Sequence, residues 1–309
     1  MKSPRTTLLD KERRDVLDES NCITILDGPL GTQLAKRGVA TPPPLWSAAA
    51  ITSAPEAIVA IHRDYADAGA TIHTAATFRT KRRDVERRRE LGLSWQDLTR
   101  LAIELARKAV PAQHRIAGSL SPLADCYRPD LSPIASLPPS LVAEEHREMA
   151  ECLADGGCDF ILCETFPHTG EAIVALEAAL TTGLPVWLAL TAGPDADLMT
   201  PDQMADTAIV AEQCGADAVL VNCTPASETD RFVQALASAK LSIPLGVYAN
   251  AGTADEGIGW ETTGQAAAER YWKFAKRWLD AGAVLLGGCC GTGPEHIHML
   301  RSRAALPPG

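Results

Sequence analysis

Three cysteines carry the clearest chemical signal in this sequence of 309 residues. Cys289 and Cys290 are adjacent in the segment GGCCGTGPEHI, and Cys223 ends the apolar run AVLVNC 66 residues earlier. Thiolates are zinc ligands, and a tetrahedral zinc with Zn–S bonds of about 2.3 Å needs sulfurs slightly under about 4 Å apart. Adjacent strand residues point to opposite faces, so both sulfurs of the pair face one point only where the chain bends, which the flanking glycines 287, 288 and 291 permit.

Two other interpretations of the adjacent pair remain open, a buried pair without a ligand and a vicinal disulfide. The count of nine cysteines is odd, and the N-terminus lacks the apolar stretch of an export signal. We therefore expect a cytoplasmic protein whose cysteines are mostly reduced thiols, which favours zinc over a disulfide. No role is assigned to the remaining cysteines, which have no partner at ligand spacing: Cys22, Cys126, Cys152, Cys158, Cys163 and Cys214.

Three protein ligands describe a zinc ion with one open position, whereas structural sites usually close themselves with paired C-x-x-C elements. Three thiolates give the site a formal charge of about −1, a poor setting for a reactive zinc hydroxide. A substrate thiol suits the open position better, because coordination deprotonates it and leaves its sulfur nucleophilic. The cysteines therefore predict alkyl transfer to sulfur. A zinc hydrolase and a non-enzymatic metal-binding protein are the alternatives, although the histidines of HIHM, 296–299, lie beyond the cysteines.

The elements that must position these cysteines alternate regularly along the chain. Helical patterns occupy 55–69, 98–110, 140–157 and 270–282. Short apolar runs predict eight strands, at 22–27, 70–77, 115–120, 159–165, 185–190, 218–223, 244–250 and 283–289. Eight such units predict a single-domain α/β protein, a parallel (β/α)8 TIM barrel. A doubly wound open sheet is the alternative, but the G-x-G-x-x-G motif after the first strand is missing.

Barrel enzymes of this kind carry their active sites where the strands end. Asp27, Glu164, Cys223 and Cys289 all fall at predicted strand ends. We divide the chain into a polar segment, 1–20, and a barrel domain, 21–309. The formal net charge of −10 argues against nucleic-acid and anionic-membrane partners, and no run of 18 apolar residues predicts a membrane span. We read the run KRRDVERRRE, 81–90, as a solvated face of mixed charge.

These motifs resemble the zinc-dependent homocysteine S-methyltransferases, a family related to betaine-homocysteine methyltransferase and to the homocysteine module of cobalamin-dependent methionine synthase. The similarity runs from about residue 22 to 302 and is carried by GGCCGTGPEHI, VNC at 221–223, LDGPLGTQL at 26–34 and HRDYADAGA…TF at 62–78. It implies a homocysteine-binding barrel with Zn2+ held by Cys223, Cys289 and Cys290. It also implies that Asp27 and Glu164 hold the homocysteine ammonium group.

The resemblance further implies methyl transfer from a sulfonium donor to the zinc-bound thiolate of homocysteine, giving methionine. S-methylmethionine is the first choice and S-adenosylmethionine the second, because the chain lacks the long C-terminal arm of the betaine enzymes; a betaine-type donor is the alternative. The chain departs from the family pattern at Ala76, where Asn is frequent, and at Arg79, where the betaine enzymes carry Tyr. Aromatic residues that could face a cationic donor, or simply pack in the core, are Trp46, Phe78, Tyr248 and Trp260.

Overall fold

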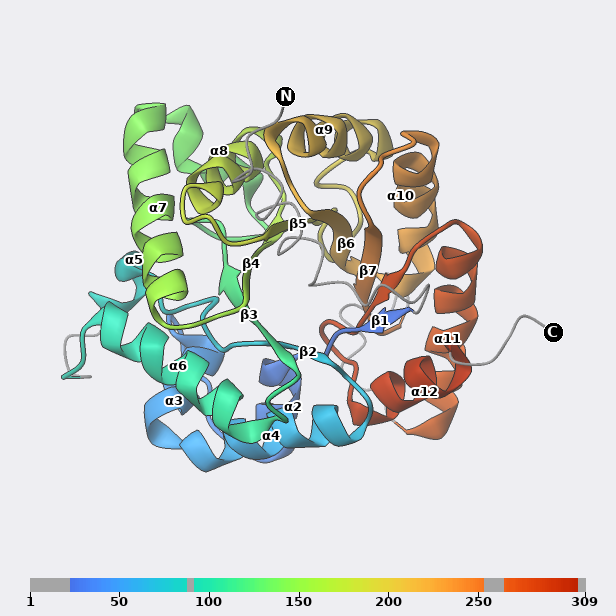
Figure 1. Cartoon of the computed structure of the whole chain (residues 1–309), viewed down its shortest axis with the longest axis horizontal. Coiled ribbons are helices and arrows are strands. Elements are labelled where there is room, and N and C mark those ends of the chain that lie inside the picture. Colours follow the sequence, from blue (N-terminus) through green and yellow to red (C-terminus); the bar gives the residue numbers. More distant parts are fainter. Residues whose placement is uncertain (1–22, 88–91, 253–263, 305–309) are drawn as a thin grey trace, which may run out of the picture.

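Eight parallel strands form one closed sheet in the computed structural model, which describes residues 23–87, 92–252 and 264–304. The strand order is β1-β8-β7-β6-β5-β4-β3-β2, and a parallel bridge between Leu26 and Ile72 joins the two end strands. Helices surround the strands in a ring (Figure 1). The predicted (β/α)8 barrel is confirmed, and the open doubly wound sheet is wrong. The polar segment 1–20 and Trp260 lie outside the described residues.

All eight predicted strands are present, although those near the chain ends are shorter than expected. They are β1 (Thr24–Ile25), β2 (Ile72–Thr74), β3 (Arg115–Leu120), β4 (Phe160–Phe166), β5 (Val186–Leu190), β6 (Ala218–Pro225), β7 (Leu245–Asn250) and β8 (Leu285–Leu286). The two longest, β4 and β6, are buried along their whole length. Burial on both faces explains their near-continuous apolar sequences.

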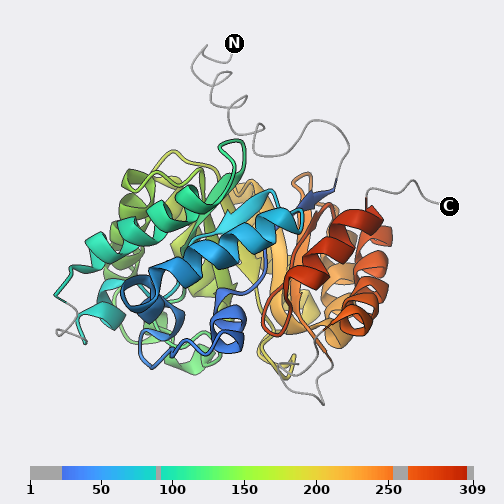
Figure 2. The ribbon, with the colours of Figure 1, turned by 90° about the horizontal axis from the view of Figure 1, so that it is seen from below.

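The helices follow the predicted apolar periodicity and begin at recognisable start signals. Ser94 caps one helix through the Asp97 N–H, and Thr200 forms a capping box with Gln203 at the start of another. The helices are α2 (Leu30–Lys36), α3 (Ala50–Ser53), α4 (Pro55–Asp67), α5 (Arg82–Val85), α6 (Trp95–Ala109), α7 (Pro139–Asp155), α8 (Thr169–Leu180), α9 (Pro201–Cys214), α10 (Ala226–Ser238), α11 (Gln265–Asp280) and α12 (Pro294–Ala304). Figure 2 shows them around the strands from a second side.

Two separate groups of apolar side chains follow from the alternation along each strand. One fills the barrel interior and includes Leu220, Trp187 and Leu285, while the other lies between the strands and the helices and includes Val219 and Val221. Because successive residues face opposite sides, the longer strands supply both groups. Any residue that breaks this alternation at a strand end is therefore informative about the site.

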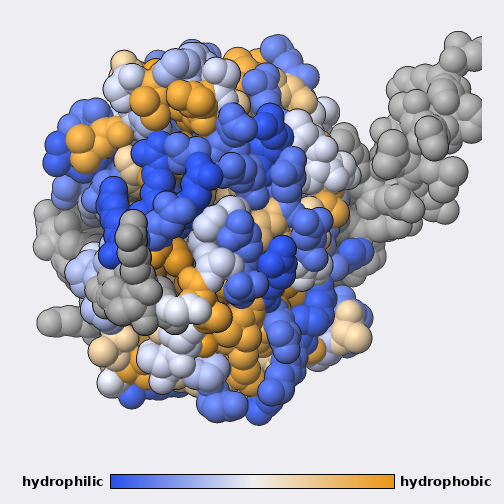
Figure 3. Space-filling model, turned by 90° about the vertical axis from the view of Figure 1, so that its left-hand side faces the viewer, coloured by the Kyte–Doolittle hydropathy of each residue, from blue (hydrophilic) through white to orange (hydrophobic). Residues whose placement is uncertain are grey.

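The basic run that begins at Lys81 is not a uniformly solvated face. Lys81 is buried and lies 3.1 Å from Asp84, while Arg82 and Arg83 pair with Glu148 and Glu145 of α7. The side of the molecule that carries α5, α7 and α8 is mostly hydrophilic, with smaller hydrophobic areas (Figure 3). No helix among the described residues is long and apolar enough to cross a membrane.

Candidate active site

The three predicted cysteines meet at the carboxyl-terminal rim of the strands. Their sulfurs lie within 4.8 Å of one another. Cys223 and Cys289 are joined as a disulfide, with their Cα atoms 5.7 Å apart, and Cys290 keeps a free thiol. The disulfide is therefore not the vicinal one weighed from the sequence; it links β6 to the loop after β8. In the reduced state the same three residues form a group that can hold a metal ion.

Cys223 reaches the barrel interior because the chain changes conformation there. Regular alternation places Leu220 inside and Val221 outside, so Cys223 would face the helices, yet it belongs to the interior group. Its φ is +48°, a left-handed value that is rare for a residue with a side chain, and the β6–β7 register shifts between Asn222 and Pro225. This bulge turns the sulfur inward.

A matching irregularity in β4 holds the Cys223 bulge in place. Thr165 also has a left-handed φ, +63°, and the β4–β5 register shifts at the same point. The Thr165 N–H donates to Asn222 Oδ1 at 3.2 Å, Asn222 Nδ2 donates to Thr165 Oγ1 at 2.7 Å, and the Thr165 hydroxyl lies 3.7 Å from the Cys223 sulfur. The strained residues Thr165 and Cys223, on strands separated by β5, are thus held together directly and through Asn222.

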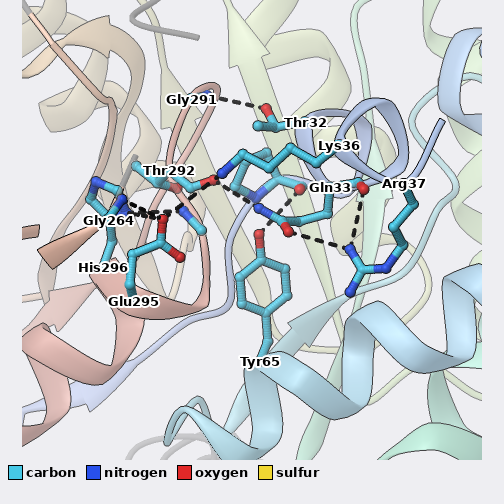
Figure 4. Close-up of polar contacts among 12 residues, drawn as sticks. Thr32, Gln33, Lys36, Arg37, Tyr65, Gly264, Gly291, Thr292, Glu295 and His296 are labelled. Carbon is cyan, nitrogen blue, oxygen red and sulfur yellow. Dashed lines mark hydrogen bonds and ion pairs between the residues drawn. The ribbon is translucent and has the colours of Figure 1, made fainter. Parts of the chain in front are cut away.

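The glycines around the adjacent pair serve close packing as well as bending. Only Gly291 of the three has a left-handed φ, +82°. At Gly287 and Gly288 an added Cβ would lie 2.8 Å from Leu26 Cβ and 2.2 Å from Thr292 Oγ1. The loop is also tied to α2, since Thr32 accepts from the Gly291 N–H at 3.1 Å and Gln33 donates to the Thr292 carbonyl at 3.3 Å (Figure 4).

Glu164 is a buried carboxyl held by two hydroxyl donors from neighbouring parts of the rim. Ser119 of β3 donates to its Oε1, and Tyr248 of β7 donates to its Oε2 at 2.9 Å. Burial raises the pKa of Glu164, and the two hydrogen bonds oppose this effect. Glu164 is therefore a buried group of the rim and not a solvated surface residue. A cation beside it would favour the ionised form.

Asp27 is the second buried carboxyl, placed directly after β1. Its Oδ2 accepts from the Thr74 N–H at 3.0 Å, so it does not cap α2, whose N-cap is Pro29. Burial raises its pKa well above the usual range, and the nearby Glu164 adds to the rise. The sequence therefore located both carboxyls, and the structure brings them into electrostatic range of each other.

The aromatic candidates divide into different environments. Tyr248 is buried beside Glu164, whereas Trp46 is 51% exposed. Phe78 lies under the cations of Arg79 and Lys81, at 5.3 and 5.9 Å from its ring centre. Tyr248 thus lies with the buried carboxyl of Glu164, whereas Phe78 packs against the basic side chains of Arg79 and Lys81.

The sequence assigned no role to several polar residues of the site. Ser119, Thr165 and Asn222 occupy strand positions that the sequence shows only as polar residues in apolar runs, a weak but readable signal. His62 and His73 also lie close to Asp27, with their Nδ1 atoms 3.8 and 4.0 Å from its Oδ2. His296 of HIHM is instead buried in α12, where its Nδ1 accepts from the Gly293 N–H.

Comparison with known proteins gives a consistent result. The family model described as homocysteine S-methyltransferase matches residues 24–304. Homocysteine S-methyltransferase 2 of Arabidopsis thaliana is 28% identical, covering 94% of this chain and 95% of its own length. Homocysteine S-methyltransferase of Escherichia coli is 31% identical, covering 98% and 99%.

A solved structure agrees in fold as well as in sequence. The homocysteine methyltransferase MmuM from Escherichia coli, in its oxidised form, superposes with a TM-score of 0.76 at 29% identity, covering 94% of this chain and 99% of that one. Its metallated form gives the same TM-score at 28% identity. The match spans the three cysteines, both carboxyls and every strand of the barrel. The chain therefore belongs to the homocysteine S-methyltransferase family.

Proposed function

We propose that the protein transfers a methyl group from a sulfonium donor to the thiolate of homocysteine, giving methionine. The observation that carries this proposal is the meeting of three cysteine sulfurs and two buried carboxyls on one rim of the barrel. S-methylmethionine is the first donor to test and S-adenosylmethionine the second. The family assignment supports the reaction class.

Cys223, Cys289 and Cys290 would hold the zinc ion. Their sulfurs are within 4.8 Å of one another, close to the spacing of a tetrahedral zinc site, provided that the Cys223–Cys289 disulfide is reduced. Burial raises the pKa of the Cys290 thiol to about 12, so a positive ion is needed to keep this residue as a thiolate. When bound, the zinc ion supplies the charge that deprotonates the substrate thiol at neutral pH.

Asp27 and Glu164 would bind the ammonium group of homocysteine. Both are buried, both have raised pKa values, and a cation placed between them favours ionisation of each. Ser119 and Tyr248 fix the Glu164 carboxyl through its two oxygens, which limits the loss of side-chain freedom on binding. These residues orient the substrate so that its sulfur lies near the three cysteines.

The transfer itself needs no water and no change of oxidation state. A lone pair of the homocysteine sulfur forms the new S–CH3 bond, while the C–S bond of the sulfonium breaks and its electron pair stays on the departing thioether. One thiolate and one sulfonium thus become two neutral thioethers. The negative charge of the thiolate and the positive charge of the sulfonium both decrease in the transition state. A buried site stabilises this less charged transition state relative to the two charged reactants.

A donor panel tests this proposal. The protein is reduced, loaded with zinc and given homocysteine with S-methylmethionine, S-adenosylmethionine or betaine, and methionine is measured by mass spectrometry. We expect methionine from a sulfonium donor at a rate at least about tenfold above that with betaine. The control omits homocysteine. Methionine from betaine alone would overturn the donor assignment, and no methionine from any donor would overturn the proposed reaction.

A further inference from the structure

A buried cluster of histidines lies behind Asp27, between β2 and α4. His62 and His73 approach Asp27 Oδ2 at 3.8 and 4.0 Å, and all three residues are buried. Both ring nitrogens of His62 and Nδ1 of His73 have no hydrogen-bond partner among the described residues. Burying unpaired polar atoms costs free energy, so three such atoms around one carboxyl need an explanation.

His73 also contacts a fourth residue, His114, which lies nearer the surface. Its Nε2 lies 3.1 Å from Nδ1 of His114, and the two rings stack with centres 5.3 Å apart and an angle of 8°. His114 is half-buried and immediately precedes β3, at the end of the strands opposite the rim. His73 and His114, at hydrogen-bonding range of each other, thus connect the helix-facing side of the sheet behind Asp27 with a half-buried position near solvent.

The cluster and the rim share Asp27 but lie on different sides of the sheet. Ile72 belongs to the barrel interior, so its neighbour His73 faces the helices. Asp27 is also in electrostatic contact with Glu164 and Tyr248 on the rim and with Tyr65 of α4. Its carboxyl is therefore the one group common to the substrate site and the histidine cluster.

Both inner imidazoles are neutral at physiological pH. Burial lowers the pKa of His62 to about 4 and that of His73 to about 3, the second also because of its histidine neighbours. A neutral imidazole accepts a proton on one nitrogen and releases one from the other, which is what passing a proton requires.

We propose that His73 and His114 form a proton relay that empties the Asp27 carboxyl when the amino group of the substrate binds on the rim. The Asp27 O–H bond breaks, His73 takes the proton at Nδ1 and gives its own from Nε2 to Nδ1 of His114, and His114 releases one from Nε2 to water. One proton leaves and no electrons are exchanged. This relay rests on the proposed function, because it requires an ammonium-bearing ligand at Asp27.

The step between Asp27 and His73 is longer than a direct hydrogen bond. One bridging water would close it, because it would find three polar partners in Asp27, His73 and His62. His62 then acts as a positioning residue for this link. Arg107 holds the far end of the relay through its 3.0 Å bond to the His114 carbonyl.

Proton release on ligand binding tests the relay. L-methionine has the ammonium group of homocysteine but no thiol, so any proton released by the reduced, zinc-loaded protein comes from the protein. Stopped-flow mixing with a pH indicator should show release in step with binding. Asp27→Asn should remove part of this release, and His114→Phe, which keeps a stacking ring, should slow that same part at least about tenfold.

The matched control is His298→Phe, the same substitution at an exposed position of α12, which should leave the rate unchanged. In His114→Ala, added imidazole should restore the rate, a rescue that a purely structural role would not give. Release at the wild-type rate in His114→Phe would overturn the relay alone. Absence of methionine binding would overturn the proposed function with it, and a second metal equivalent lost in His62→Phe would make the cluster a metal site instead.

Discussion

The chemistry of the rim depends on a few residues whose conformations are unusual. Cys223 and Thr165 both have left-handed φ values without being glycine, each of which costs of order 1–3 kcal/mol. The hydrogen bonds between Thr165 and Asn222 compensate for part of this cost. The segment VNC, 221–223, therefore combines Cys223, which we propose as a zinc ligand, with Asn222, the residue that holds its bulge.

Cys290 offers a direct test of the metal centre, since among the three clustered cysteines it is the one outside the disulfide. We expect Cys290→Ser to lower the zinc content of the purified protein from one equivalent to under about a fifth, because a serine hydroxyl is a far poorer zinc ligand than a thiolate. Metal content is measured by mass spectrometry, alongside circular dichroism to confirm folding.

Cys214→Ser is the matched control, because Cys214 lies on α9 away from the rim and is half-buried. It should bind zinc as the wild type does. Full zinc content in Cys290→Ser would contradict the assignment of Cys290 as a ligand.

Glu164 should give the ligand-free protein a pH-dependent stability. Its folded-state pKa exceeds the ordinary value of 4.5, so folding favours the protonated form. The resulting stabilisation is complete below about pH 4.5 and is lost as pH rises through the raised pKa, by about 1.4 kcal/mol for each tenfold increase in proton affinity that folding gives the carboxyl. Glu164→Gln should therefore raise the Tm relative to wild type at pH 8, with the difference shrinking towards pH 4.

The same variant should bind homocysteine more weakly, since a neutral amide cannot balance an ammonium group. Calorimetric titration at pH 8 measures this loss. A Tm difference between Glu164→Gln and wild type that does not change with pH would show that the Glu164 carboxyl is not the titrating group.

At the scale of the elements, short apolar runs predicted every strand, and apolar residues at helical spacing predicted the helices at 55–69, 98–110, 140–157 and 270–282. The runs were sufficient because parallel strands are buried on both faces and so stay apolar throughout. The register shifts at Cys163/Phe166 and Asn222/Pro225 were not predictable, because a bulge depends on the neighbouring strand as much as on its own residues. The same holds for His73 and His114, which only the β2–β3 pairing brings together.

Gly246 of β7 lies at a closely packed point inside the barrel. An added Cβ would lie 2.6 Å from Leu220 Cδ2 and 2.7 Å from Leu285 Cβ. We expect Gly246→Ala to lower the free energy of unfolding by about 1–3 kcal/mol through overpacking. Denaturant titration measures this change.

Gly31→Ala provides the opposite expectation in the same experiment. No atom lies within 4 Å of its added Cβ and it sits inside α2, so alanine should stabilise the protein by about 0.5–1 kcal/mol. Equal effects of the two substitutions would show that interior packing does not explain the Gly246 position.

At the scale of the whole molecule, the sequence predicted the barrel, which is confirmed, and it predicted that the three cysteines and both carboxyls lie at strand ends. Their positions could be predicted because the carboxyl ends of all strands in this fold lie on one rim. The order of the strands in the sequence therefore gives the order of these residues around the barrel. The hydrogen bonds that connect these residues could not be predicted, because the side-chain contacts of Ser119, Tyr248 and Asn222 depend on the curvature of the closed sheet. The net charge of −10 agrees with a small-molecule enzyme and carries no positional information.

The closing seam of the barrel has a consequence for its motions. β1, β2 and β8 have only two or three residues each, while β4 and β6 have seven and eight, and β1 meets β2 through a single bridge. Short strands lose few contacts when they open, so amide hydrogens there should exchange with solvent fastest among the eight strands. Asp27 and the Cys289–Cys290 loop follow these short strands, whereas Glu164 and Cys223 stand on the two longest strands, β4 and β6. The active site thus combines residues of the long strands β4 and β6 with residues that follow the short strands β1 and β8, which we expect to open more often. A ligand bound to both sets should slow amide exchange mainly in β1 and β8.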